Sequence, residues 1–394
     1  MDERRRELNT RVDAIRAEQN KLSGEIEEAA KAGKVNEPEF AEARERSSAL
    51  KSELKELEPE LGELDEQRDR ILVSLPNLPD PEAPDGETEE DNVTLREVGD
   101  RPDFDFEPQD HLELGQRHGW IEMEAAAELS GSRFAYLLGD LVMLELVLVR
   151  FAMERISAEG FRPTIPPVLV RERALFGTGV FPGDREMIYE VPNDELFLIG
   201  TSEVSLASLH ADQIMEAGEL PKRYGGFSTC FRREAGAAGR DTRGIFRVHQ
   251  FDKVEMFSFV EPEHSREEHE RILAIQEGIL GELEIPYRVV DIAVGDLGAP
   301  AARKFDCEAW IPSQERFREV TSCSNTTDFQ ARRLSSRYRA AQGESPEHVH
   351  TLNGTAVAVG RTLLALLENG QREDGSVEIP AALQEFGAPE RIPT

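Results

Sequence analysis

The chain has 394 residues, of which 39% are hydrophobic and 31% are charged, and its formal net charge is −32 at pH 7. This length is sufficient for two domains and a substantial core. The strong negative charge excludes the overall basic footprint of most nucleic-acid binders, so a nucleic acid would have to be bound by local basic patches.

The sequence lacks the features of a membrane or secreted protein. Its longest apolar run, Leu141 to Met153, is too short to span a bilayer and contains charged residues. The N-terminus, MDERRREL, lacks the apolar core of a signal peptide. We therefore expect a cytoplasmic protein with no membrane partner. The cysteines Cys230, Cys307 and Cys323 are widely spaced, so neither a disulfide framework nor a structural zinc site is expected.

The first seventy-odd residues follow a heptad pattern. Apolar or small residues spaced mostly three and four apart form two runs: Leu8, Val12, Ile15, Leu22 and Ile26, then Phe40, Ala43, Ser47, Leu50, Leu54, Leu57, Leu61 and Leu64. Between the runs, Gly33, Asn36 and Pro38 interrupt helix formation. The pattern predicts a coiled-coil hairpin over residues 1–74, with two antiparallel helices of roughly 30 residues and about 45 Å each. The alternative for this segment alone is a simple oligomerisation coil.

The rest of the chain predicts a linker followed by one α+β domain. Residues 75–92 are dense in proline and acidic residues, which indicates an extended linker. Expected elements in 93–394 are a helix in 139–160, a strand in 161–170, a strand entering a helix in 194–204, a helix in 264–283, strands in 286–294, 305–312 and 317–325, and a helix in 357–369. Without regular βαβ alternation, this order favours an antiparallel sheet with flanking helices. Neither a P-loop nor a Rossmann fingerprint follows a strand.

A charged block between Phe231 and Phe257 predicts a nucleotide site. Two strand-like runs joined by a Gly-rich turn carry Arg232, Glu234, Arg243, Arg247, Phe251, Lys253 and Glu255. Arginine forks bind phosphate, and an aromatic face stacks on a base. The plain alternative is a hairpin with a charged face, in which Phe251 belongs to the core and Lys253 and Glu255 form a surface pair.

The spacing of this block closely resembles motif 2 of class II aminoacyl-tRNA synthetases, in detail that of the bacterial-type seryl-tRNA synthetases. The resemblance implies that Arg232 contacts the α-phosphate of ATP and the serine carboxylate. It places Glu234 at the adenine edge, Phe251 on the adenine ring, and Glu255 in the serine pocket, with Arg247 as a support. The helix in 139–160 and the strand after it resemble motif 1, which in the family builds the dimer interface.

The loop GTSEV, with Thr201, Ser202 and Glu203, matches a family loop in the serine pocket. A carboxylate and acceptor oxygens are what an amino-acid ammonium needs. The alternative is a helix N-cap, in which Thr201 or Ser202 caps and Glu203 lies in the first turn. Both roles can hold together.

Two later stretches complete the resemblance. Glu319, Val320, Thr321 and Ser322 match family positions that meet ATP, and Glu319 and Ser322 match those that meet its Mg²⁺, a cation that prefers hard oxygen ligands. In the third motif, Arg361 matches the arginine that binds the γ-phosphate, although a surface helix arginine is the plain alternative. Asn353 and Thr355 match positions beside the serine side chain, where many members have serine in place of Thr355.

The resemblance covers nearly the whole chain and implies a homodimeric serine–tRNA ligase. ATP and L-serine would form seryl-adenylate at Arg232 and Arg361, and tRNA(Ser), bound by the N-terminal arm, would accept the seryl group; tRNA(Sec) is a further candidate acceptor. The alternatives are a paralogue that supplies seryl-adenylate to another acceptor and a coiled-coil interaction protein with a relict nucleotide site. Family members ordinarily begin with a short helix ahead of the arm, whereas the heptads here start almost at Met1. A misassigned start, a truncated chain or a divergent paralogue would each explain this difference.

Overall fold

The structure, a computed structural model, describes residues 1–235, 241 and 243–393. The chain divides into two compact units, Met1–Leu75 and Pro76–Thr394, which are described separately. Among the described residues, no helix combines the length and the apolar character that crossing a bilayer requires.

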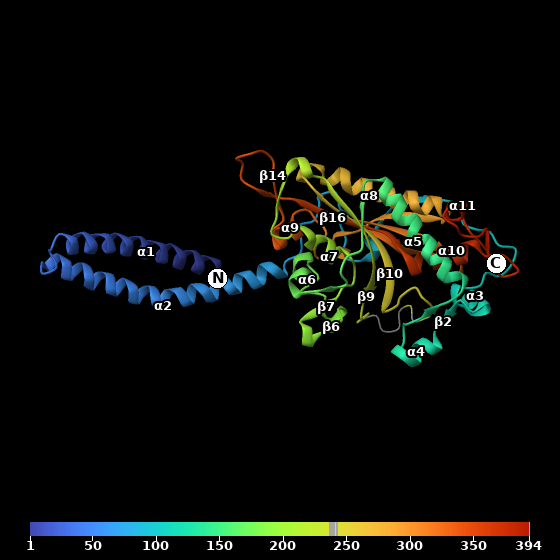
Figure 1. Cartoon of the computed structure of the whole chain (residues 1–394), viewed down its shortest axis with the longest axis horizontal. Coiled ribbons are helices and arrows are strands. Elements are labelled where there is room, and N and C mark those ends of the chain that lie inside the picture. The colour runs from blue at the N-terminus through green and yellow to red at the C-terminus, as the bar shows by residue number, and fades with distance from the viewer. Residues whose placement is uncertain (236–240, 242, 394) are drawn as a thin grey trace. The chain divides into compact units, whose positions relative to one another are not determined.

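The N-terminal unit is a hairpin of two long helices, α1 (Asp2–Lys31) and α2 (Pro38–Ser74), which lie side by side in Figure 1. The side chains buried between them come from the predicted heptad positions: Leu8, Val12, Ile15, Leu50 and Leu54. At the tip, Gly33 has a φ of +75°, in the left-handed region that glycine adopts at little cost. Pro38 is the first residue of α2, where its missing N–H is not needed. The predicted helical hairpin is confirmed.

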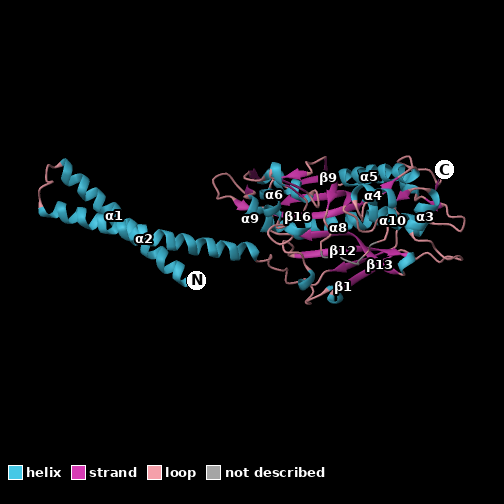
Figure 2. Ribbon diagram, turned by 90° about the horizontal axis from the view of Figure 1, so that it is seen from below, coloured by secondary structure: helices cyan, strands magenta, loops and turns pink. Residues whose placement is uncertain are grey.

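The second unit is built on an eight-stranded sheet with the order β1-β11-β12-β13-β16-β10-β9-β4, which runs across the view in Figure 2. Its strands are β1 (Val93–Val98), β4 (Arg162–Thr164), β9 (Lys222–Phe231), β10 (Gln250–Val260), β11 (Tyr287–Asp291), β12 (Arg303–Ile311), β13 (Arg316–Asn325) and β16 (His350–Ala358). All neighbouring strands pair antiparallel except β4 and β9, which are parallel. The predicted antiparallel sheet is confirmed.

Helices and short strands surround this sheet. The helices are α3 (His111–His118), α4 (Glu124–Ser130), α5 (Asp140–Ala158), α6 (Glu172–Thr178), α7 (Glu203–Ala207), α8 (Ser265–Glu282), α9 (Phe329–Leu334), α10 (Val359–Gly370) and α11 (Ala381–Gln384). The short strands are β2 (Ile121–Glu122), β3 (Tyr136–Leu137), β5 (Leu169–Val170), β6 (Glu190–Val191), β7 (Leu196–Leu198), β8 (Ile214–Glu216), β14 (Arg337–Arg339), β15 (Glu347–His348), β17 (Val377–Glu378) and β18 (Arg391–Ile392).

The two faces of the sheet are covered differently, and this positions the site. Side chains alternate between the faces along each strand. Val254 and Met256 of β10 enter the main core, which includes apolar residues of α5, α8 and α10. Phe257 and Phe259, on the other face of β10, pack in a smaller cluster with residues of α7 and α9. On this second face Lys253 and Glu255, which precede Phe257, are charged.

Three expected segments differ from the structure. The strand expected in 161–170 is two short strands, β4 and β5, because Pro166 and Pro167 between them have no N–H to donate. Residues 75–92 are irregular apart from one 3₁₀ turn, but they pack on the second unit: Asn77 is buried and donates to the carbonyl of Thr326 at 2.9 Å. Because it is held in this way, most of the expected linker belongs to the second compact unit.

The third difference concerns the charged block. Arg232, Glu234, Arg243 and Arg247 lie in the connection between β9 and β10 and not in the strands themselves. Strand β9 ends at Phe231, and Glu234, with a φ of +50°, has left the extended conformation. The predicted Gly-rich turn falls mainly on residues 236–240 and 242, which lie outside the described residues.

Candidate active site

The candidate site residues of strand β10 share one face of the sheet. Phe251, Lys253 and Glu255 alternate along β10, and Glu255 lies opposite Thr355 of β16 in the strand register. Ala356 of β16 is an extra residue at this point, where the register shifts. Asn353, two residues from Thr355, is on the same face. The sheet thus brings together residues of motifs that are about a hundred positions apart in the sequence.

One cavity gathers every residue that the resemblance assigns to ATP. Its lining includes Arg232, Glu234, Arg247, Phe251, Glu319, Val320, Thr321, Ser322 and Arg361. We call it the nucleotide cavity. It continues into a larger polar cavity of about 970 Å³, with which it shares Phe246, Arg247, Glu319 and Arg361. The combined lining mixes basic and acidic side chains with the rings of Phe246, Phe251 and Phe317. Its arginines can bind phosphate and its aromatic rings can stack on a base.

The guanidinium groups of two arginines lie close to aromatic rings in the lining of the nucleotide cavity. The guanidinium carbon of Arg232 is 5.3 Å from the ring centroid of Phe251, and its Nε donates to the carbonyl of Gly200 at 3.2 Å. The guanidinium of Arg361 lies 4.7 Å from the ring centroid of Phe246 and donates to the carbonyl of Glu319 at 2.9 Å. Both side chains are therefore held at the cavity before any ligand is bound.

Glu234 and Arg247 form an ion pair at the edge of the same cavity. Glu234 is largely buried, whereas Arg247 is 28% exposed. Next to this connection, Nδ1 of His249 lies 2.8 Å from the carbonyl oxygen of Arg232. These contacts fix the segment that carries Arg232.

A second group of charged side chains, of which Asp306 is buried, lies on strands β12 and β13. Lys304 donates to Asp306 at 3.0 Å, and Asp306 lies opposite Ser322 in the strand register. Burial raises the pKa of Asp306 to about 7, although Lys304 opposes that change. Burial would also raise the pKa of Glu319, but Arg361, Lys304 and Arg232 outweigh it and lower that pKa to about 2. Glu319 is therefore an anion at any physiological pH.

These oxygens also fit a magnesium ion carried with ATP. Glu319 and Ser322 supply hard oxygen donors at the nucleotide cavity. Oδ1 of Asp306, on the neighbouring strand, is buried and has no hydrogen-bond partner among the described residues. An unsatisfied buried carboxylate oxygen beside two further oxygen donors is consistent with a hard cation at this place.

The residues assigned to serine form a compact polar cluster beside the nucleotide cavity. The hydroxyl of Thr201 accepts from Lys253 at 2.9 Å and donates to Glu255 at 3.3 Å, and Lys253 and Glu255 form an ion pair. Lys253 and Glu255 are 6% and 1% exposed, so the alternative of a surface pair is wrong. Their strand is an inner one, between β9 and β16, and Thr201 contacts both side chains.

The GTSEV loop makes a cap-like contact and also reaches the polar cluster. The backbone N–H of Glu203 donates to the Thr201 hydroxyl at 3.2 Å, as in a cap, while that hydroxyl also contacts Lys253 and Glu255. Ser202 occupies the N-cap position of α7 without a side-chain cap, and its hydroxyl is buried close to Gly226. Thr201 is thus brought to the cluster, whereas the Ser202 side chain points elsewhere.

Glu203 is joined to the cluster through two amides. Its Oε1 accepts from Asn353 at 2.9 Å and from Gln330 at 2.7 Å. Burial, followed by the charge of Glu255, raises the pKa of Glu203 to about 7. Gln330 was not predicted, because nothing in its local sequence distinguishes it from a core residue of a short helix. Lys304, Asp306 and Phe246 were also missed as site residues, and Lys253, although named in the charged block, was given no role of its own in the site.

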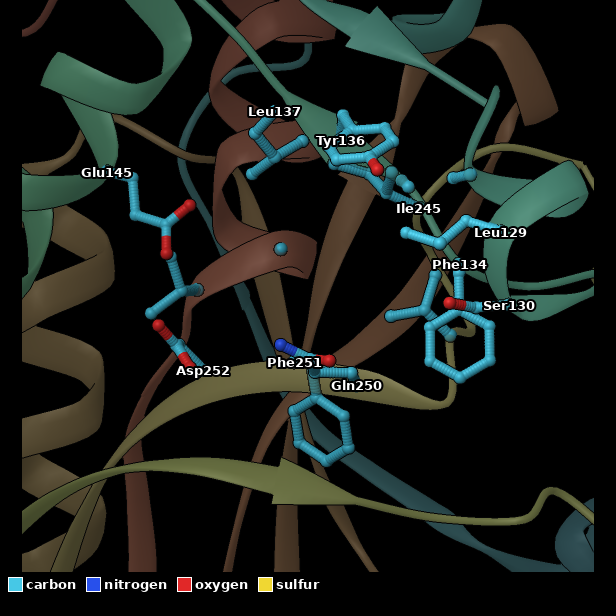
Figure 3. Close-up of a pocket in the computed structure, with 15 residues that line it drawn as sticks. Leu129, Ser130, Phe134, Tyr136, Leu137, Glu145, Ile245, Gln250, Phe251 and Asp252 are labelled. Atoms are coloured by element: carbon cyan, nitrogen blue, oxygen red, sulfur yellow. The ribbon is translucent and has the colours of Figure 1, made fainter. Parts of the chain in front are cut away.

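A further cavity of about 380 Å³ adjoins the nucleotide cavity, and Phe251 lines both. Figure 3 shows Glu145 of α5 and Asp252 of β10 on one side of it, with their carboxyl groups turned toward one another. Burial, followed by the charge of Asp252, raises the pKa of Glu145 to about 7. This acid pair was not predicted, because its members lie far apart in the sequence.

Comparison with known proteins identifies the family to which the chain belongs. A family model described as the tRNA synthetase class II core domain (G, H, P, S and T) matches residues 188–370. One described as the seryl-tRNA synthetase N-terminal domain matches residues 1–79. The antiparallel sheet and the core-domain match define a class II aminoacyl-tRNA synthetase.

Individual relatives narrow this class. The serine–tRNA ligases of Acidothermus cellulolyticus and Thermobifida fusca are 51% and 49% identical to the chain, over 98% of its length and over 90% and 89% of theirs. The crystal structure of seryl-tRNA synthetase from Pyrococcus horikoshii complexed with ATP matches with a TM-score of 0.93 and 43% identity, over 99% of this chain and 91% of that one. The chain belongs to the seryl-tRNA synthetase family. The predicted class II serine–tRNA ligase is confirmed.

Proposed function

We propose that the chain activates L-serine with ATP and transfers the seryl group to tRNA(Ser), with tRNA(Sec) as a further candidate acceptor. One observation carries the proposal: a single sheet face joins a cavity ringed by all nine ATP-assigned residues to a buried polar cluster around Glu255. A nucleotide and a small polar substrate can meet at such a place.

In the first step, a serine carboxylate oxygen attacks the α-phosphorus of ATP, a new P–O bond forms, and pyrophosphate leaves. Arg232 is assigned to the α-phosphate and the serine carboxylate, and Arg361 to the γ-phosphate. Phe251 offers a face to the adenine, and Glu234, fixed by Arg247, lies at its edge. Catalysis then rests on positioning and on charge stabilisation by groups that are already in place.

Glu319 and Ser322 are the residues proposed to hold the Mg²⁺ that accompanies ATP, with Val320 and Thr321 lining the same cavity. When bound, the ion would neutralise charge on the phosphates. The low pKa of Glu319 keeps this ligand ionised.

Serine is proposed to lie among Thr201, Glu203, Glu255, Asn353 and Thr355, with the backbone of Ser202 completing the loop. Carboxylates attract its ammonium group, while hydroxyl and amide groups pair with its side-chain hydroxyl. Alanine would leave buried polar groups unpaired and should be rejected strongly. Threonine must be excluded by the size of the space, which is a harder discrimination of one methyl group.

In the second step, the 3′-terminal hydroxyl of the tRNA attacks the acyl carbon and AMP leaves. We propose that residues 1–74 act as the tRNA-binding arm and residues 93–394 as the catalytic domain. The match of residues 1–79 to the seryl-tRNA synthetase N-terminal domain supports the first assignment.

We also propose that the enzyme is a cytoplasmic homodimer that assembles through the motif 1 region. Large apolar side chains are exposed there on α5 and after β4: Met143 at 61%, Leu146 at 57% and Ile165 at 84%. Several exposed apolar side chains in one region are typical of a protein–protein interface.

Two assays test the proposal together. Serine-dependent ATP–pyrophosphate exchange should be present, and purified tRNA(Ser) should be charged with serine. Exchange without charging would instead support a paralogue that serves another acceptor. Absence of exchange in the folded protein would support an interaction protein with a relict site and overturn the proposal.

A further inference from the structure

A buried glutamine outside the assigned residues is tied directly to the amino-acid cluster. Gln330 of α9 is completely buried, and its side-chain N–H group donates to Oε1 of Glu203 at 2.7 Å and is 3.4 Å from the carbonyl of Thr178. Glu203 and Gln330 are 127 positions apart in the chain. A bond between elements so distant depends on the complete fold.

Two threonine hydroxyls on the far side of the Gln330 amide from Glu203 fix its orientation. Its carbonyl oxygen accepts from the hydroxyl of Thr351 at 3.0 Å, and that hydroxyl lies 2.6 Å from the hydroxyl of Thr326. Because an ionised carboxylate accepts hydrogen bonds only, the amide must present its N–H to Glu203. The chain of buried hydroxyls therefore holds a donor toward this carboxylate.

As a result, the two carboxylate oxygens of Glu203 have different surroundings. Oε1 accepts from both Gln330 and Asn353, whereas Oε2 accepts no hydrogen bond from any residue that the structure describes. The amide of Asn353 is in turn fixed by the oxygen that it shares with Gln330. One oxygen is thus used for support, and the other is left for a ligand.

We infer that Gln330 is a positioning residue that sets serine affinity by holding Glu203 ionised and Asn353 in place. This inference rests on the proposed function, in which Glu203 and Asn353 contact serine. The charged groups that face Glu203 are Glu255, which disfavours its ionised form, and Lys253 and Arg232, which favour it. The hydrogen bond from the neutral amide of Gln330 also favours the ionised form of Glu203.

The test compares Gln330→Met with a matched control, Gln371→Met. Gln371 is also buried in the second unit and donates to backbone carbonyls of Gln109 and Glu368, outside the site. For Gln330→Met we expect a rise of about tenfold or more in serine KM from the loss of a hydrogen bond to a charged group, with ATP KM changed less than about twofold. The increase in serine KM that accompanies a fall in pH should also begin at a higher pH, because the lost hydrogen bond favours the ionised form of Glu203. Gln371→Met should change neither property.

A double-mutant cycle with Glu203→Gln separates positioning from a general packing role. If Gln330 acts through Glu203, Gln330→Met should add little to serine KM in the Glu203→Gln background. Equal effects of Gln330→Met in both backgrounds, or an unchanged serine KM in the folded single variant, would overturn the inference. If Glu203→Gln itself leaves serine KM unchanged, the assignment of Glu203 to the serine pocket fails, and this inference fails with it.

Discussion

Glu319 and Ser322 point from the same face of strand β13 although three positions separate them. In a regular strand, residues three apart face opposite sides of the sheet. Here Ser322 pairs with Asp306 and Thr321 with Cys307, whereas Glu308 pairs with Glu319, so Val320 is an extra residue in the ladder. This β-bulge places both predicted metal ligands at the nucleotide cavity.

The first prediction concerns magnesium. Glu319→Gln should lower the rate of serine-dependent pyrophosphate exchange by about 100-fold and raise the Mg²⁺ concentration needed for half-maximal activity, because a charged oxygen ligand is lost. Ser322→Ala should have a smaller effect in the same direction. Titration of exchange activity with Mg²⁺, and of Mn²⁺ binding in the presence of ATP, measures both effects. Glu315→Gln, at an exposed glutamate just before the same strand and outside the cavity lining, is the control, and an equal effect there would contradict the assignment.

The bulge in β13 is an example of a feature that could not be predicted from the sequence. The helical hairpin was predictable because heptad contacts involve residues three or four positions apart in each helix. The residues assigned to ATP were chosen from their resemblance to family motifs, and the structure brings all nine to the lining of one cavity. The extra residues Val320 and Ala356 were not, since a bulge is defined only relative to the register of a partner strand.

Burial was the other quantity that the sequence did not reveal. Lys253 and Glu255 alternate as charged residues do on an open strand, but β10 is an inner strand of the sheet and both side chains are buried. Likewise, Gln330 and Glu203 become neighbours only when α9 is placed against α7. Contacts of this kind depend on tertiary packing and leave no local pattern.

The second prediction concerns the two arginines of the nucleotide cavity. Arg232→Ala and Arg361→Ala should each reduce adenylate formation by about two to three orders of magnitude, because each removes a charge-assisted contact to phosphate. Circular dichroism and thermal unfolding should show a preserved fold. Arg372→Ala, which removes an exposed arginine paired with Glu378, should leave exchange unchanged. Near-normal exchange in either folded cavity variant would remove that arginine from the site.

The third prediction concerns pH. The raised pKa of Glu203, about 7, means that this carboxyl becomes protonated and neutral as the pH falls through that value. If Glu203 attracts the serine ammonium, serine KM should rise roughly tenfold between pH 8 and pH 6, because only about a tenth of the carboxyl stays ionised one unit below its pKa. ATP KM should not follow this change. Glu203→Gln should give a high serine KM that is flat across the same range, and a steep profile in that variant would assign the titration to another group.

The fourth prediction concerns the arm, where most basic side chains already have partners. Arg11 and Arg16 of α1 form ion pairs with Glu53 and Glu58 of α2. Exposed ion pairs of this kind contribute little to stability, typically 1 kcal/mol or less. They nevertheless leave these arginines less available to bind phosphate groups. Deleting about residues 18–51 and rejoining the helices with a short turn should leave serine activation nearly intact and severely weaken tRNA charging.

Three basic residues of the arm differ from Arg11 and Arg16 because they form no ion pair within the described arm. Replacing them tests tRNA binding more specifically than the deletion does. Arg44, Lys51 and Lys55 lie seven and four positions apart on one face of α2, and within the described arm none of them has an acidic partner in ion-pair distance. Replacing all three with Gln should raise the KM for tRNA by about tenfold or more and reduce the salt dependence of charging by roughly one unit of slope per lost phosphate contact, while exchange is unchanged. The control variant Arg11→Gln/Arg16→Gln should affect charging less, since those side chains are paired across the helices. Equal losses in both variants would mean that overall charge, and not this face of α2, governs tRNA binding.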